Sequence, residues 1–208
     1  MPVKNKLHTI KKFSEYKFKE KASQFIGLAY PVETEDEAKD KLEEIKKEYY
    51  DARHHCYAWQ INKNDTSKYS DDGEPNGTAG IRIFNAIQHF NLTNVLVVSV
   101  RYFGGIKLGV GPLGKAYYNS AFGALSNSEI IIKLKYFMIK IKYEYNHTKH
   151  IHHFLNTYQA NILDNSFENK PVITCLIQPG IFDDLKKKLN EATKAQIDFE
   201  LLNDSVWI

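Results

Sequence analysis

A glycine-rich segment carries the residue pattern in this chain that is best suited to binding an anion. It spans residues 101–109, reads Arg-Tyr-Phe-Gly-Gly-Ile-Lys-Leu-Gly, and lies between a predicted buried strand and a predicted helix. Strand, flexible loop and helix N-terminus in this order let backbone N–H groups point at a phosphate. The residues that we expect to bind phosphate or nucleic acid are Arg82, Arg101, Gly104, Gly105, Lys107, Gly109 and Lys115.

Two phosphate-binding motifs are nearly present in this segment. Residues 109–115 match G-x-x-x-x-G-K, but Ala116 stands where an NTPase P-loop needs a hydroxyl for magnesium. Residues 109–114 match the dinucleotide pattern G-x-G-x-x-G, but Pro112 removes one N–H from the loop and the predicted strand ends several residues earlier. The simpler alternative is that these glycines only permit a tight turn and close helix packing.

The distribution of charge favours the anion-binding interpretation. Residues 75–128 contain no Asp or Glu but four basic residues. Arginine occurs only at positions 53, 82 and 101, among 28 basic residues, and all three lie in the candidate segments. A guanidinium group offers a planar donor fork that suits phosphate, carboxylate or base edges. The alternative is that each arginine pairs with a nearby acid, namely Asp51, Asp71, Asp72 or Glu74.

A second group of chemically active residues combines Arg53, His54 and His55 with the acidic residues Asp71, Asp72 and Glu74. Histidine with carboxylates can bind a metal or transfer protons, and Cys56 beside a histidine could act as a nucleophile. Adjacent strand residues point to opposite faces, so at most one of the two histidines should share a site with the acidic loop. Asp-Gly and Asn-Gly are also ordinary turn sequences.

No metal or other cofactor is expected. The spacing of the second group matches no known ligand set. A further cluster, on a predicted helix over residues 146–158, is more typical of a solvated helix face and consists of His147, His150, His152 and His153.

Composition limits the class of protein. The chain has 208 residues, of which 43% are hydrophobic and 25% charged, as in folded globular proteins. No segment approaches the roughly 18 apolar residues of a membrane span, and the lysine-rich start lacks the apolar core of a secretory signal. Its two cysteines form no C-x-x-C pair, so free thiols are expected. These features predict a cytoplasmic protein.

The elements that would position these residues alternate in type. The N-terminal part predicts strands over residues 16–30, 53–61 and 94–102, helices over 34–50, 78–90 and 112–125, and a loop over 62–77. Thr34 and Glu37 form a capping box at the start of the first helix. The C-terminal part predicts strands over residues 130–143, 160–167, 171–178 and 196–202, with helices over 146–158 and 181–189.

The C-terminal order is β-α-β-β-α-β, which is the ferredoxin-like arrangement. We therefore predict an α+β protein with two domains, over residues 1–132 and 133–208.

Three ordered blocks, over residues 53–58, 70–80 and 95–109, resemble the signature segments of the YigZ/IMPACT family, in its bacterial two-domain form. The resemblance implies that the first domain is a left-handed βαβ domain, as in a small-subunit ribosomal protein and the fourth domain of elongation factor G. It also implies a C-terminal domain similar to the fifth domain of that factor.

The resemblance also carries expectations about function. Eukaryotic relatives regulate translation by competing for the activator of the amino-acid-starvation kinase, and they have an additional N-terminal domain. The family suggests no catalytic residues, so the leading hypothesis is a non-catalytic protein that binds RNA, the ribosome or a translation-related protein. Two alternatives stay open: a hydrolase that uses His54 or His55 with Asp71, Asp72 and Glu74, and a protein-interaction module.

Overall fold

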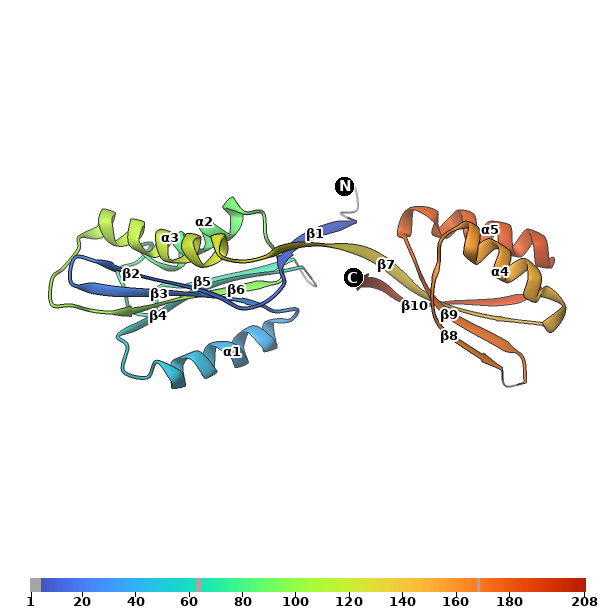
Figure 1. Cartoon of the computed structure of the whole chain (residues 1–208), viewed down its shortest axis with the longest axis horizontal. Helices are drawn as coiled ribbons and strands as arrows, with labels where there is room; N and C mark the ends of the chain where they lie inside the picture. The colour runs from blue at the N-terminus through green and yellow to red at the C-terminus, as the bar shows by residue number, and fades with distance from the viewer. Residues whose placement is uncertain (1–4, 63–64, 168) are drawn as a thin grey trace. The chain divides into compact units, whose positions relative to one another are not determined.

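The protein has an α+β fold, and its computed structural model describes residues 5–62, 65–167 and 169–208 (Figure 1). The chain divides into two compact units. The first comprises Leu7–Ile132, and the second comprises Lys133–Ile208 together with Asn5 and Lys6. Among the described residues, no helix combines the length and the apolar character that crossing a membrane requires.

The first unit is built on one antiparallel sheet with the strand order β2-β3-β6-β4-β5. Strands β3 and β4 both pair antiparallel with β6, so they run parallel to each other, and α1 connects them. Helix α1 covers one face of the sheet, and α2 and α3 cover the other (Figure 1). The elements are β2 (Ser14–Glu20), β3 (Ser23–Pro31), α1 (Glu35–Glu48), β4 (His54–Ile61), β5 (Thr66–Ser70), α2 (Gly80–His89), β6 (Val95–Tyr102) and α3 (Val110–Ser126).

The central strand β6 is buried on both faces, as its continuous apolar sequence predicts. Val95 and Val97 belong to the core beneath α2 and α3. Leu96 and Val98 belong to the separate core beneath α1. The sheet thus separates two apolar cores, and β6 delivers Arg101 to the end of the strand.

Helix α1 begins with the predicted capping box. The Glu37 amide donates to Thr34 Oγ1 at 3.1 Å. The Glu37 carboxylate accepts from the amide of Glu33 at 2.7 Å, one residue before the position that the motif predicts.

The prediction of a continuous loop over residues 62–77 is wrong in part, because this segment contains β5. Strand β5 pairs with β4 alone, in a register that joins Tyr57 to Ser70 and Ile61 to Thr66. Its sequence Thr-Ser-Lys-Tyr-Ser is largely polar, as suits an edge strand, so it carries no apolar alternation.

The second unit confirms the predicted ferredoxin-like order. Strand β7 lies between β9 and β10, and β8 pairs with β9. Strand β1 (Lys6–Ile10), most of which belongs to the first unit, also pairs with β7. The elements are β7 (Ile130–Tyr143), the 3-10 turn η1 (Tyr145–His147), α4 (Thr148–Thr157), β8 (Asn161–Phe167), β9 (Pro171–Ile177), α5 (Pro179–Thr193) and β10 (Ile197–Trp207). Strand β10 is longer than predicted. The prediction ended too early because two register shifts interrupt the alternation of the side chains along the strand.

One face of this second sheet packs against both helices. Ile151 of α4 and Leu185 of α5 are fully buried with Ile139 and Cys175 of the strands. His150 and His153 lie on the exposed side of α4.

Candidate functional site

A pocket of about 360 Å³ lies in the first unit where both candidate motifs meet. Its size is within the range of small-molecule sites. It forms because β4 and β6 are antiparallel neighbours in a register that places His54 directly opposite Arg101. The residues that line it are Arg53, His54, Glu74, Pro75, Arg101, Phe103, Lys107, Leu108, Gly109, Val110 and Leu113.

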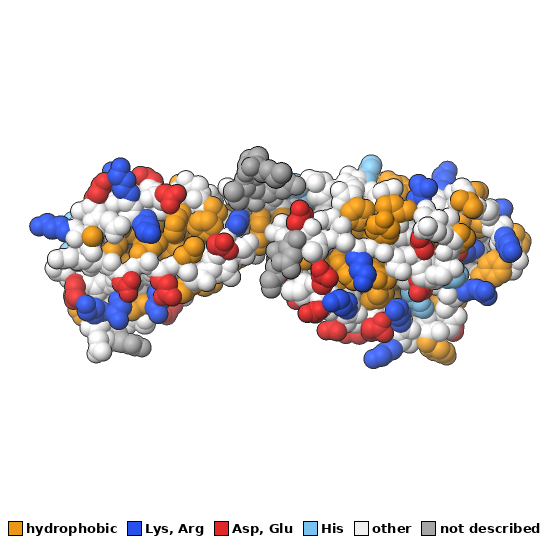
Figure 2. Space-filling model, turned by 180° about the vertical axis from the view of Figure 1, so that it is seen from behind, with side chains coloured by type: hydrophobic (Ala, Val, Ile, Leu, Met, Phe, Trp, Pro, Cys, Tyr) orange, Lys and Arg blue, Asp and Glu red, His pale blue; other side chains and the backbone are white. Residues whose placement is uncertain are grey.

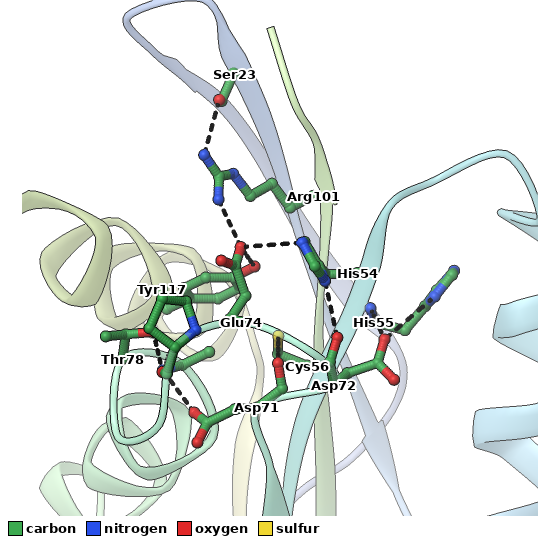
Figure 3. Close-up of polar contacts among 12 residues, drawn as sticks. Ser23, His54, His55, Cys56, Asp71, Asp72, Glu74, Thr78, Arg101 and Tyr117 are labelled. Atoms are coloured by element: carbon green, nitrogen blue, oxygen red, sulfur yellow. Dashed lines mark hydrogen bonds and ion pairs between the residues drawn. The ribbon is translucent and has the colours of Figure 1, made fainter. Parts of the chain in front are cut away.

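The Glu74 carboxylate is the centre of a buried polar network in the pocket wall (Figure 3). Its side chain is 5% exposed. Oε1 accepts a hydrogen bond from Arg101 Nη1 at 2.5 Å and another from the Tyr117 hydroxyl at 2.7 Å. His54 Nε2 lies 3.7 Å from the same oxygen. Burial raises the pKa of Tyr117, so its hydroxyl keeps the proton that it donates.

Arg101 is 5% exposed and is held on several sides. Nη2 donates to Ser23 Oγ at 3.2 Å. The guanidinium lies over the rings of Phe25 and Phe103, 5.4 Å from each centroid. Its Nε is buried without a hydrogen-bond partner among the described residues. The sequence left two interpretations of Arg101 open: binding an anion, or pairing with a nearby acid. The contacts support the second, because Glu74 neutralises the charge of Arg101.

The other predicted basic residues fall into two groups. Arg53 and Lys107 are exposed and line the pocket, and no described acid forms an ion pair with either. Arg82 and Lys115 are exposed on α2 and α3, outside the pocket lining. The unpaired positive charge at the pocket therefore comes from Arg53 and Lys107.

Glycine is needed in the loop for different structural reasons at different positions. A Cβ added to Gly104 would lie 1.8 Å from the carbonyl oxygen of Ala22, so this position requires close packing. Gly105 and Gly109 have φ values of +86° and +83° and open space around them, so they serve the turn. Gly109 is also the N-cap of α3. No side chain caps this helix, and its first turn contains no acid.

The acidic loop uses its aspartates as hydrogen-bond acceptors. Asp71 Oδ1 accepts from the amides of Ala79 and Gly80, each at 2.8 Å, and Oδ2 accepts from Gly77 at 2.9 Å. A carboxylate is favoured there by the N-terminus of α2. Asp72 Oδ2 accepts from the amide of His55 at 2.6 Å. Neither aspartate lines the pocket.

Both histidines contact Asp72, although strand alternation predicted that only one would meet the acidic loop. His54 Nδ1 lies 2.8 Å from the Asp72 carbonyl, and His55 Nδ1 lies 3.8 Å from its carboxylate. Asp72 has a φ of +43°, which lets its carbonyl and carboxylate face different sides of the strand. Only His54 lines the pocket. Since the carbonyl can only accept, His54 Nδ1 carries the proton of this hydrogen bond, and Nε2 faces Glu74.

Cys56 is not prepared for nucleophilic attack. Its side chain is fully buried and donates to the carbonyl of Asp71 at 2.9 Å. Burial raises the pKa of the thiol well above its usual value, so the reactive thiolate does not form at neutral pH. In the described ranges, no three His, Cys, Asp or Glu side chains gather as metal ligands do. Cys56 is therefore not available as the nucleophile that the sequence suggested.

Several pocket residues were missed by sequence reasoning. Phe103 directly precedes two glycines and is 40% exposed. An aromatic residue in a glycine-rich loop is a sequence signal from which this pocket residue could have been predicted. Two contacts join residues that are far apart in the sequence, Ser23 with Arg101 and Tyr117 with Glu74. No local sequence pattern predicts such contacts. The apolar wall that was also missed consists of Pro75, Leu108, Val110 and Leu113.

Comparisons with known proteins agree with this two-part organisation. Residues 21–125 match the Impact N-terminal domain, and residues 137–204 match the SBDS protein C-terminal domain. An IMPACT family member of Haemophilus influenzae is 33% identical over 185 residues, covering 88% of this chain and 90% of the relative. The IMPACT family member YvyE of Bacillus subtilis is 39% identical over 124 residues, covering 59% and 57% of the two chains.

A solved structure described as a hypothetical protein is similar over almost the whole chain. It has a TM-score of 0.70 at 24% identity, and the similarity covers 98% of this chain and 100% of the other. At this identity the likeness supports the fold.

Proposed function

Because the chain belongs to the IMPACT family, we propose that it is a translation-regulator-like cytoplasmic protein that binds RNA, free or on the ribosome, without catalysing a reaction. The observation that supports this most is the charge of the pocket. Glu74, the acid that lines it, is neutralised by Arg101, while Arg53 and Lys107 have no acidic partner among the described residues.

The surroundings of the pocket add to this support. Arg82 and Lys115 are exposed on the helices that follow the two motifs, and residues 75–128 contain no acid that would oppose them. Basic and acidic side chains are mixed on the face of the molecule shown in Figure 2. The net charge of +3 is small. Attraction to RNA would therefore come from local phosphate contacts rather than from a generally basic surface.

A translation-related protein is the second candidate partner, and one observation favours it. Three apolar residues of the glycine-rich segment and the start of α3 are unusually exposed: Phe103 at 40%, Ile106 at 54% and Val110 at 68%. Apolar residues of this kind contribute to protein interfaces. The salt dependence of the affinity distinguishes the two candidate partners, because binding through apolar contacts depends on salt far less than phosphate binding does.

The test is binding of labelled single-stranded RNA, duplex RNA and ribosomes between about 50 and 200 mM salt. The informative variant is Arg53→Ala/Lys107→Ala. For single-stranded RNA, losing two phosphate contacts should reduce the slope of log affinity against log salt by about 1.4. Arg101 is left intact because it is buried in the fold.

The matched control is Lys12→Ala/Lys47→Ala, which removes two exposed lysines that line no part of the pocket. It should bind like the parent. If the pocket variant binds as tightly as the parent and with the same salt slope, the proposed RNA site is wrong.

A further inference from the structure

We propose that the pocket holds one unpaired nucleotide, with its base against Phe103 and its phosphate between Lys107 and the N-terminus of α3. This inference rests on the proposed RNA-binding function and names the unit of RNA that enters. A pocket of about 360 Å³ is at the small end of ligand sites, so it suits a single nucleotide rather than a length of strand.

Phe103 provides a surface on which a base can stack. Its ring is 40% exposed, and the guanidinium of Arg101 lies over it, 5.4 Å from its centroid. The guanidinium thus contacts the ring, and the residue keeps a solvent-exposed surface. Leu108 and Leu113 extend the apolar wall and are each only 6% exposed. Unpaired bases are bound in proteins by such aromatic and apolar surfaces.

The phosphate end is built from two cations and two amides. Arg53 and Lys107 line the pocket without an acidic partner in the described part of the chain. The amides of Val110 and Gly111 open a 17-residue helix that no side chain caps. A Cβ at Gly109 or Gly111 would meet nothing within 4 Å, so a phosphate can approach the backbone there.

The polar groups of the wall leave part of their hydrogen-bonding capacity unused. Arg101 is 5% exposed, yet its Nε has no acceptor among the described residues. The contacts of Glu74 with Arg101, Tyr117 and His54 all reach Oε1, which leaves Oε2 able to accept from a ligand. An unused carboxylate oxygen in the wall matches a base edge that carries an amino group.

The free oxygen of Glu74 predicts which bases bind. Adenine and cytosine have an exocyclic amino group that can donate to the Glu74 carboxylate, whereas uracil has none. AMP and CMP should therefore bind at least tenfold more tightly than UMP, in line with the usual discrimination by a paired base edge. Ribose 5-phosphate and inorganic phosphate lack the base and should bind more weakly still.

The experiment is calorimetric titration of the full chain with AMP, CMP, UMP, ribose 5-phosphate and inorganic phosphate. Phe103→Ala should weaken AMP binding at least tenfold, and Phe103→Tyr should restore it, because tyrosine keeps the stacking ring. Tyr50→Ala is the control, since Tyr50 is 82% exposed and does not line the pocket. Thermal unfolding of each variant checks that the first unit is folded.

The outcomes separate this inference from the proposed function. AMP binding that depends on Phe103 supports the pocket, and competition with RNA then assigns the nucleotide to a strand. If AMP binds but RNA does not, the pocket inference stands with a free nucleotide as ligand and the proposed function fails. If RNA binds with the expected salt slope while AMP does not bind and Phe103→Ala leaves RNA affinity unchanged, the inference is overturned alone. If neither ligand binds, both proposals fail.

Discussion

Glu74 determines whether the polar wall of the pocket can stay buried. Its side chain is 5% exposed and that of Arg101 is 6% exposed, and each would be costly to bury without the other. Replacing such a pair with apolar residues can be neutral, but removing one partner leaves an uncompensated charge. Tyr117 would also lose the acceptor of its hydroxyl. The network thus couples the stability of the first unit to the shape of the site.

We expect Glu74→Ala to lower the free energy of unfolding by about 3 to 5 kcal/mol, the usual cost of breaking a buried ion pair. Urea denaturation measures this loss. Asp40 is an exposed carboxylate of α1, so Asp40→Ala should change stability by no more than about 0.5 kcal/mol. A loss below about 1 kcal/mol for Glu74→Ala would contradict the buried network.

The sequence identified most of the polar pocket residues but not their arrangement. Arg53, His54 and Glu74 were assigned to one motif, and Arg101 and Lys107 to another. They meet because His54 lies opposite Arg101 in the β4–β6 register. Register depends on packing across the whole sheet, which no short motif encodes. The roles of these residues in binding stay predictions.

At the scale of elements, the loop after β6 depends on one glycine far more than on another. Gly104 lies so close to Ala22 that an added methyl group would overlap its carbonyl oxygen, whereas Gly111 has open space. Gly111 is also within the first turn of α3. The two positions therefore form a natural pair for testing how the loop is held against Ala22.

Gly104→Ala should destabilise the protein by about 2 kcal/mol or more, because the backbone must move to admit the methyl group. Gly111→Ala should leave stability unchanged or raise it by up to about 1 kcal/mol, since alanine favours a helix over glycine. Chemical denaturation of both variants is the measurement. Equal effects at the two positions would show that the loop is not packed as described.

Elements with a strong local signal were predicted well. Helix α1 was found from its capping box and β6 from its apolar run. Strand β5 was missed because its polar sequence gains its structure from pairing with β4. The full length of β10 was missed because register shifts near Asn203 break the alternation.

At the scale of the whole molecule, each unit contains one buried cysteine and one tryptophan. Cys56 and Trp59 lie in the first unit, and Cys175 and Trp207 lie in the second. Burial raises the pKa of Cys175 to about 12. An unfolded thiol ionises near pH 8.5, so above that pH the unfolded state binds fewer protons than the folded state. Stability must therefore fall as the pH rises from about 9 toward 12.

We expect Cys175→Ala to flatten this alkaline loss in the second unit by up to about 1.4 kcal/mol per pH unit. The measurement is urea unfolding followed by Trp207 fluorescence in a Trp59→Phe background, between about pH 8 and pH 10.5. Cys56→Ala is the internal control, because Cys56 belongs to the core of the other unit. An unchanged slope in Cys175→Ala would contradict the assignment.

The overall architecture was predictable because few topologies suit its order of elements. The C-terminal β-α-β-β-α-β order gave the ferredoxin-like sheet, which the strand pairing confirms. The α+β class and the family are likewise confirmed. The pocket was not predictable at this scale, since it depends on side chains from the loop, both central strands and α3.

The turn that Asp71 holds also protects a chemically labile dipeptide. Asn76-Gly77 is the kind of sequence in which asparagine deamidates readily, because the glycine amide nitrogen attacks the side-chain carbonyl and expels ammonia to form a cyclic imide. Here the Gly77 amide donates to the Asp71 carboxylate at 2.9 Å, and the negative charge opposes the loss of the proton that the attack requires. We therefore expect deamidation at Asn76 to be slower in the folded protein than after unfolding, when this hydrogen bond is lost.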